Sequence, residues 1–171
     1  DINMGCPFTM ISRRGKGAGL LPHPERVEAL MEVVKDFPEI QCSVKMRLGW
    51  EDPGECLKLL PLLNAAPLAA IFLHARVGVQ EYKGEADKEA FEIFYKECEH
   101  PLYYNGDVLT LEDIQAVTER FPRLEGVMIG RGLLANPALA QEYAENKELT
   151  GEERLNKFKA FHAELLAAYA E

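Results

Sequence analysis

The sequence has no long apolar run and no paired cysteines. None of its apolar stretches approaches the roughly 20 residues that a membrane-spanning helix needs. Its four cysteines, Cys6, Cys42, Cys56 and Cys98, form neither a C-x-x-C pair nor another spacing typical of a zinc site. Scattered single cysteines are typical of a reducing compartment. We therefore expect a cytoplasmic protein with no metal and no membrane partner.

Positive charge is also scarce. Lysine and arginine together number 19 against 28 aspartates and glutamates, which gives a formal net charge of −9 at pH 7. This balance argues against a nucleic acid held by the overall charge of the protein. It leaves room for a local basic face, because Arg13, Arg14 and Lys16 lie close together in the sequence.

Short apolar runs alternate with amphipathic segments along the chain. The pattern predicts strands over residues 43–47, 68–74, 102–105 and 124–129 and helices over residues 24–35, 54–64 and 87–98, with a further helix that opens at Thr110. The predicted strands are apolar almost throughout and alternate with helices. They therefore indicate an α/β fold with a parallel sheet covered by helices.

Polar residues gather at the carboxyl ends of these strands. They are Cys6, Lys45, His74, Asn105 and Arg131. Both a TIM (β/α)8-type barrel and an open Rossmann-like sheet bind their ligands at this end. No G-x-G-x-x-G motif follows the first strand, so the barrel is favoured.

The strand ends are too few for a whole barrel. A TIM barrel has eight strands and typically about 250 residues, whereas this sequence of 171 residues supplies five strand ends. We therefore expect residues 1–145 to form a partial barrel without the first three strands, and residues 146–171 to start a C-terminal helical element. A partial barrel has unpaired strand edges, which predicts a homo-oligomer.

The first seven residues, Asp-Ile-Asn-Met-Gly-Cys-Pro, present Cys6 on a glycine turn at a strand end. A thiol in this place can donate a proton or act as a nucleophile, although a free cysteine is often only a small buried apolar residue. Asn3 lies three positions earlier and can hydrogen-bond a flat polar substrate. Cys6 is thus the candidate catalytic residue, and Asn3 is a candidate contact of the substrate.

Further cationic or ionisable residues lie on the next two strands. Lys45 and Arg47 share one side of their strand because side chains alternate. A buried lysine needs an anionic partner and suits the electron-rich edge of a flavin or a developing enolate; a solvated pair on an edge strand is the alternative. His74 alone could be a core histidine, but Arg76 two positions later indicates a polar mouth.

Two glycine-containing turns follow the last two strands. Asn105-Gly106-Asp107 precedes the helix that opens at Thr110, and Gly130-Arg131-Gly132 precedes Asn136-Pro137. Glycine lets backbone N–H groups approach a phosphate, and helix N-termini favour anions. The loops after strands seven and eight are also the usual phosphate site of TIM barrels. The two turns therefore predict a phosphate-bearing cofactor.

From Asp1 to about Tyr143 the sequence resembles one family, the flavin-dependent tRNA-dihydrouridine synthases. The segments that carry the resemblance are residues 1–7, 44–49, 74–76, 82–84, 105–107 and 126–132, together with the glycine-rich residues 14–21. One departure concerns residues 74–78, where the family commonly has His-Gly-Arg-Thr-Arg and this chain has His-Ala-Arg-Val-Gly. A basic contact of the family is therefore missing there.

The resemblance implies a reaction in which reduced FMN passes a hydride to C6 of a uridine in tRNA and an acid protonates C5. The product is 5,6-dihydrouridine, and NADPH re-reduces the flavin. Cys6 would be the acid. The implied cofactor ligands are Lys45, His74, Asn105, Gly106, Asp107, Gly130 and Arg131, and the implied substrate contacts are Asn3, Arg47 and Arg76.

Two other interpretations stay open. A related FMN enzyme, similar to dihydroorotate dehydrogenase, would act on a free pyrimidine, although the cluster of Arg13, Arg14 and Lys16 favours a polyanionic substrate. A partial barrel would otherwise be an inactive fragment that only associates with itself.

Overall fold

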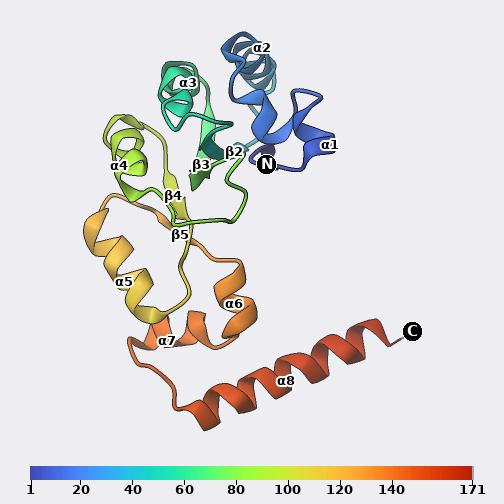
Figure 1. The fold of residues 1–171 in the computed structure, drawn as a ribbon, viewed down its shortest axis with the longest axis vertical. Helices are drawn as coiled ribbons and strands as arrows, with labels where there is room; N and C mark the ends of the chain where they lie inside the picture. Colours follow the sequence, from blue (N-terminus) through green and yellow to red (C-terminus); the bar gives the residue numbers. More distant parts are fainter. Residues whose placement is uncertain (171) are drawn as a thin grey trace. The chain divides into compact units, whose positions relative to one another are not determined.

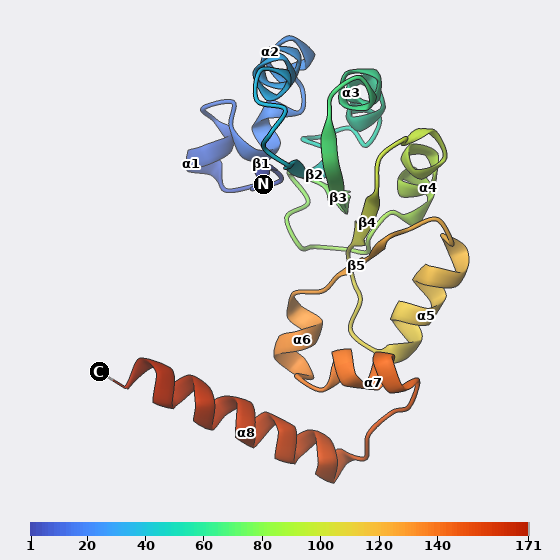
Figure 2. The same ribbon diagram turned by 180° about the vertical axis from the view of Figure 1, so that it is seen from behind.

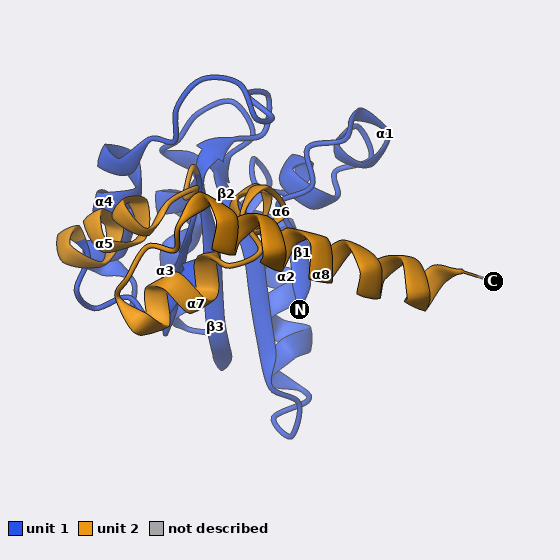
Figure 3. Ribbon diagram, turned by 90° about the horizontal axis from the view of Figure 1, so that it is seen from below, with its two compact units in different colours: residues 1–106, 121–128 blue, residues 107–120, 129–171 orange. Residues whose placement is uncertain are grey.

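The computed structural model describes residues 1–170 and divides into two compact units. Unit 1 consists of residues 1–106 and 121–128, and unit 2 consists of residues 107–120 and the chain from residue 129 onward (Figure 3). Unit 1 contains the sheet, whereas unit 2 is helical. The expected boundary between residues 145 and 146 stays a prediction.

Unit 1 is built on a parallel sheet of five strands (Figure 1). They are β1 (Ile2–Met4), β2 (Cys42–Gly49), β3 (Leu68–Val77), β4 (Leu102–Asn105) and β5 (Gly126–Met128), and they pair in the order β1-β2-β3-β4-β5. Each strand therefore pairs with the next strand of the chain, without the reversal of order found in doubly wound sheets. The α/β class and the parallel sheet are confirmed, and the last strand is shorter than predicted.

Helices lie in a row along this sheet. They are α2 (Pro24–Lys35), α3 (Glu55–Asn64) and α4 (Lys88–Glu97), side by side in Figures 1 and 2. The helix predicted over residues 24–35 is confirmed, and α4 begins after Asp87 because that carboxylate caps it and accepts a hydrogen bond from the N–H of Ala90. The short helices α1 (Thr9–Ser12) and η1 (Gly17–Leu20) were not predicted, since neither is long enough to show a period.

Side-chain alternation gives the sheet an apolar face and a polar one. On β2, Val44, Met46 and Leu48 are fully buried, so Lys45 and Arg47 project from the opposite face. The apolar face continues into an aromatic cluster, in which the ring of Phe91 on α4 lies edge-on to that of Tyr104 at 4.8 Å. This packing anchors α4 and leaves the other face of the sheet for polar groups.

Unit 2 contains α5 (Leu111–Arg120), α6 (Arg131–Ala135), α7 (Leu139–Glu145) and α8 (Gly151–Tyr169). The helix predicted to open at Thr110 is confirmed as α5, and Thr110 and Asp113 cap it: Thr110 Oγ1 accepts the N–H of Asp113 at 3.1 Å, and Asp113 accepts the N–H of Thr110 at 3.0 Å. All apolar side chains of α8 are exposed. Within residues 1–170, no helix combines the length and the apolar character needed to cross a membrane.

A buried carboxylate joins α7 to α8. Glu142 is fully buried and accepts hydrogen bonds from Asn136 Nδ2 at 2.9 Å, the N–H of Leu149 at 3.0 Å and Arg154 Nε at 2.6 Å. Burial alone would raise the pKa of Glu142, but the hydrogen bonds, that of Arg154 foremost, hold this pKa below its ordinary value. The ionised form is therefore the one that stabilises unit 2.

We expect unit 2 to lose stability in acid. Because the folded-state pKa of Glu142 is lowered, its contribution is present above the unfolded-state pKa and is lost as the pH falls through the folded-state value. Glu142→Ala should lower the free energy of unfolding at pH 7 by about 2 kcal/mol. Amide hydrogen exchange of α8 at pH 7 and pH 3 measures both effects. Equal exchange in the variant and the unsubstituted chain at pH 7 would contradict the prediction.

Candidate active site at the carboxyl ends of the strands

The strand register of unit 1 brings three predicted site residues into one row. Arg47 on β2 pairs with His74 on β3, and His74 pairs with Asn105 on β4. Lys45 lies on the same face of β2, and its Nζ donates to Asn105 Oδ1 at 3.2 Å. Asn105 Nδ2 in turn donates to the carbonyl of Met128 at 2.8 Å. Side chains from β2 and β4 and the backbone of β5 are thus joined at one end of the sheet.

The Cys6 turn is held through hydrogen bonds to its backbone groups. Asn3 Oδ1 accepts the N–H of Gly5 at 3.0 Å and that of Cys6 at 3.1 Å. The carbonyl of Cys6 accepts the N–H of Ala18 at 2.9 Å. Gly17 has a φ of +57°, and a Cβ there would lie 2.6 Å from that carbonyl oxygen, so glycine is required. The half-buried thiol of Cys6 is therefore held in a defined place.

Arg47 binds backbone carbonyls from three segments. It is 2% exposed. Its Nε donates to the carbonyl of Gly5 at 3.0 Å, and its Nη1 donates to those of Val77 at 2.9 Å and Glu81 at 2.7 Å. Burial lowers the pKa of Arg47, while Tyr82 counteracts this shift. The sequence predicted Arg47 beside the substrate and missed this bridging role, which only the fold brings about.

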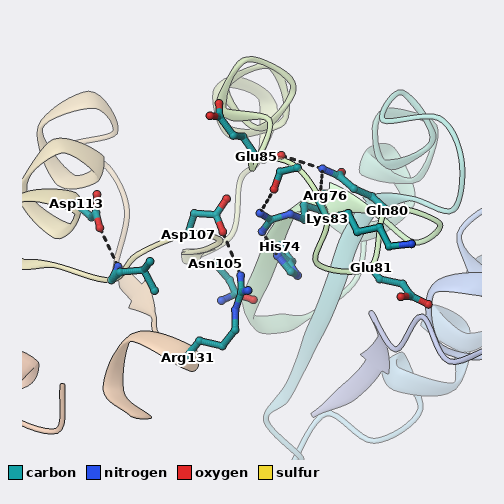
Figure 4. A network of polar contacts seen from close by, with 12 residues as sticks. His74, Arg76, Gln80, Glu81, Lys83, Glu85, Asn105, Asp107, Asp113 and Arg131 are labelled. Atoms are coloured by element: carbon teal, nitrogen blue, oxygen red, sulfur yellow. Dashed lines mark hydrogen bonds and ion pairs between the residues drawn. The ribbon is translucent and has the colours of Figure 1, made fainter. Parts of the chain in front are cut away.

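His74 and Arg76 lie at the end of β3 (Figure 4). Arg76 is 1% exposed; its Nη1 lies 3.2 Å from His74 Nε2, and its Nη2 donates to the carbonyl of Gly84 at 2.6 Å. Arginine can only donate, so Nε2 is the acceptor and the proton of the neutral imidazole is on Nδ1. Gln80 Nε2 donates to the carbonyls of Lys83 and Glu85, which folds residues 78–86 over this end of the strand.

The cations of this site favour an electron-rich ligand. Burial, with the nearby charge of Arg47 as the second cause, lowers the pKa of Lys45. Within residues 1–170, neither Lys45 nor Arg47 forms an ion pair. An anionic or electron-rich group bound here would offset this cost. Such cations are chemically compatible with the edge of a flavin ring, and the assignment of Lys45 to a flavin stays a prediction.

Lys45 is expected to oppose folding when no ligand is bound. Its lowered pKa means that the folded protein disfavours the charged form of Lys45. The resulting loss of folding stability is fully present below the folded-state pKa. It disappears as the pH rises from the folded-state pKa to the unfolded-state pKa. Lys45→Met should therefore raise the free energy of unfolding at pH 7, less the contribution of the lost hydrogen bond to Asn105, and abolish FMN retention. Denaturant titration and desalting with FMN check the two effects; a less stable variant would contradict the prediction.

The predicted phosphate-binding residues fall into both units. Asn105 and Gly106 belong to unit 1, where Gly106 adopts a φ of +140° that favours glycine. Asp107, Gly130 and Arg131 belong to unit 2. There Arg131 Nη2 lies 3.2 Å from Asp107 Oδ1 (Figure 4). A Cβ on Gly130 would meet nothing within 4 Å. Gly130 therefore has open space in which a ligand can approach its backbone.

Trp50 is a further residue near this end of the sheet that the sequence did not single out. A Cβ on Gly78 would clash with the indole ring of Trp50 and would lie 3.2 Å from the Cβ of Ala18. The glycine at position 78, where the resembling family has arginine, therefore makes room for the single tryptophan. In the sequence, the signal that could have drawn attention to Trp50 was that it is the only tryptophan.

Comparison with known proteins identifies relatives over most of the chain. The family described as dihydrouridine synthase matches residues 1–169. The probable tRNA-dihydrouridine synthase 1 of Synechocystis is 35% identical over 156 residues, which cover 90% of this chain and 43% of that protein. The tRNA-dihydrouridine(16) synthase of Vibrio cholerae is 32% identical over 149 residues, 85% of this chain and 46% of that protein. The chain thus spans less than half of the length of these curated relatives.

Proposed function

We propose that this chain, which belongs to the dihydrouridine synthase family, carries catalytic and cofactor-binding residues of an enzyme that reduces uridine in tRNA to 5,6-dihydrouridine with FMN. The observation that carries the proposal is the row of Arg47, His74 and Asn105, with Lys45 bound to Asn105, at the strand ends where Cys6 is presented. NADPH is the proposed reductant. The relatives do not favour a dihydroorotate dehydrogenase-like activity.

The same proposal extends to the fold. Five parallel strands that pair in chain order, with helices between them, support a part of a TIM (β/α)8-type barrel. In such a barrel the carboxyl ends of the strands form the active site. The homo-oligomer expected from unpaired strand edges stays a prediction.

In the proposed mechanism Lys45 and His74 hold the flavin ring. Bound reduced FMN supplies the hydride for C6 of the uracil ring. Cys6 donates its proton to C5, so that a hydride and a proton together saturate the C5–C6 double bond, and solvent then reprotonates the thiolate. Because both side-chain lone-pair directions of Asn3 Oδ1 are used by the Cys6 turn, Asn3 offers a ligand its Nδ2 donors.

The cofactor's phosphate is assigned to the glycine turns. In unit 1, Asn105 and Gly106 at the end of β4 are proposed ligands of the cofactor. In unit 2, Gly130 and Arg131 at the start of α6 are proposed ligands as well, because helix N-termini favour anions. Asp107 would orient the guanidinium of Arg131, with which it already pairs. Arg76 would contact the substrate nucleotide near His74.

The test uses this chain, FMN and an unmodified tRNA transcript. After incubation with FMN and desalting, a retained flavin absorption band is the expected first result. Addition of NADPH and the transcript should then convert uridine to dihydrouridine, detected as the mass of two added hydrogens in nuclease digests. A chain that retains FMN but leaves every uridine unchanged would contradict the assigned reaction.

A further inference from the structure

One segment of unit 1 has a charge opposite to that of the whole chain. The chain carries 28 carboxylate residues, yet none of them lies between residues 2 and 24. The same segment contains Arg13, Arg14 and Lys16, all exposed. Within the described residues, none of the three cations forms an ion pair. This segment is thus a basic surface on an acidic protein.

The same segment carries exposed apolar side chains. Phe8 is 73% exposed and Met10 is 78% exposed. Both belong to the part of unit 1 around α1, which lies at the periphery of that unit in Figure 3. Proteins bind single-stranded nucleic acids through two features, cations that contact the phosphates and exposed aromatic rings on which bases stack. This segment has both.

The two ends of this segment meet at the candidate catalytic residue. The N–H of Ala18 donates to the carbonyl of Cys6 at 2.9 Å, so residues 7–17 form a closed loop. Gly17 packs directly against Cys6, and the side chain of Arg26 lies against Gly15. A polymer bound to this loop is therefore held within reach of the Cys6 thiol.

We propose that residues 8–16 bind single-stranded RNA adjacent to the uridine that is reduced. Arg13, Arg14 and Lys16 contact phosphates, and a base next to the target stacks on Phe8. The proposal rests on the proposed function, because it assumes that the uridine reaches Cys6. An anionic membrane surface has the same complementarity to cations and apolar side chains; RNA is favoured because the loop closes on Cys6.

The phosphate contacts are tested by the salt dependence of binding. Fluorescence anisotropy with a labelled, unmodified tRNA transcript gives the dissociation constant of this chain at several salt concentrations. Arg13→Ala, Arg14→Ala and Lys16→Ala should each reduce the slope of log affinity against log salt by about 0.7 to 0.9. Lys58→Ala, an exposed cation on α3, is the matched control and should leave the slope unchanged.

The stacking contact is tested at fixed salt. Phe8→Ala should weaken binding of the transcript about tenfold or more without changing the salt slope, whereas Ile93→Ala, at a position 52% exposed on α4, should have no effect. The proposal is overturned if the loop variants bind RNA as tightly as the unsubstituted chain. This holds whether or not the same variants bind phosphatidylserine vesicles more weakly. Weaker RNA binding in the loop variants supports the RNA-binding proposal even if the unsubstituted chain forms no dihydrouridine. An absence of dihydrouridine would overturn only the proposed reaction.

Discussion

Replacing Cys6 with alanine is expected to lower the rate of uridine reduction by about 10²–10⁴-fold, the usual contribution of a positioned general acid. The hydride acceptor would remain in place, but no group of the protein would supply the proton for C5. FMN retention and the unfolding midpoint should change little, because the turn is held by Asn3 and by the N–H of Ala18, which bind the backbone. Single-turnover kinetics with reduced FMN and an unmodified tRNA transcript measures the effect.

A second cysteine of the same chain supplies the control. Cys42 is also free and half-buried, but it lies at the start of β2, away from the carboxyl ends of the strands. The Cys42→Ala chain should therefore reduce uridine at the same rate as the unsubstituted chain. Equal rates for the Cys6 and Cys42 variants would remove Cys6 from the proposed mechanism and would assign the proton to another group or to water.

The sheet of this fold follows from local sequence patterns. β4 was predicted with its observed bounds, and α2 likewise, because each has a clear apolar period and ends at a strong local signal. The last strand was predicted over residues 124–129 but spans Gly126–Met128, since an apolar run does not define where its pairing partner ends. Element types were thus encoded locally, whereas strand ends depend on neighbouring strands.

The site could be predicted only at the level of which residues lie at the strand ends. Alternation placed Lys45 and Arg47 on one face, and the structure agrees. The partners of Arg47 are 30 to 42 positions away in the sequence, and no periodicity encodes such contacts. The same holds for Gly17, whose contact with Cys6 arises only once η1 has folded against β1.

Replacing Arg47 with methionine is expected to lower the free energy of unfolding by about 3 kcal/mol, because three charge-assisted hydrogen bonds to carbonyls are lost. Removal of a buried charge without an ion pair offsets part of this loss. The hydrogen bonds should dominate, since they join the Cys6 turn to the end of β3 and to residue 81. Denaturant titration measures the change, and limited proteolysis should show new cleavage within residues 78–86.

The same substitution should also impair catalysis through position rather than chemistry. Without the hydrogen bond from Arg47 to Gly5, the Cys6 turn becomes mobile, so the rate constant of uridine reduction should fall. The affinity for RNA should stay within about threefold of that of the unsubstituted chain, a difference below 1 kcal/mol. Arg47→Lys should not restore it, because an ammonium group cannot span carbonyls that the planar guanidinium reaches together. Lys58→Met, on the exposed side of α3, is the control for loss of a cation. An Arg47→Met chain with unchanged stability and protease resistance would show that the three hydrogen bonds contribute nothing net and would contradict the prediction.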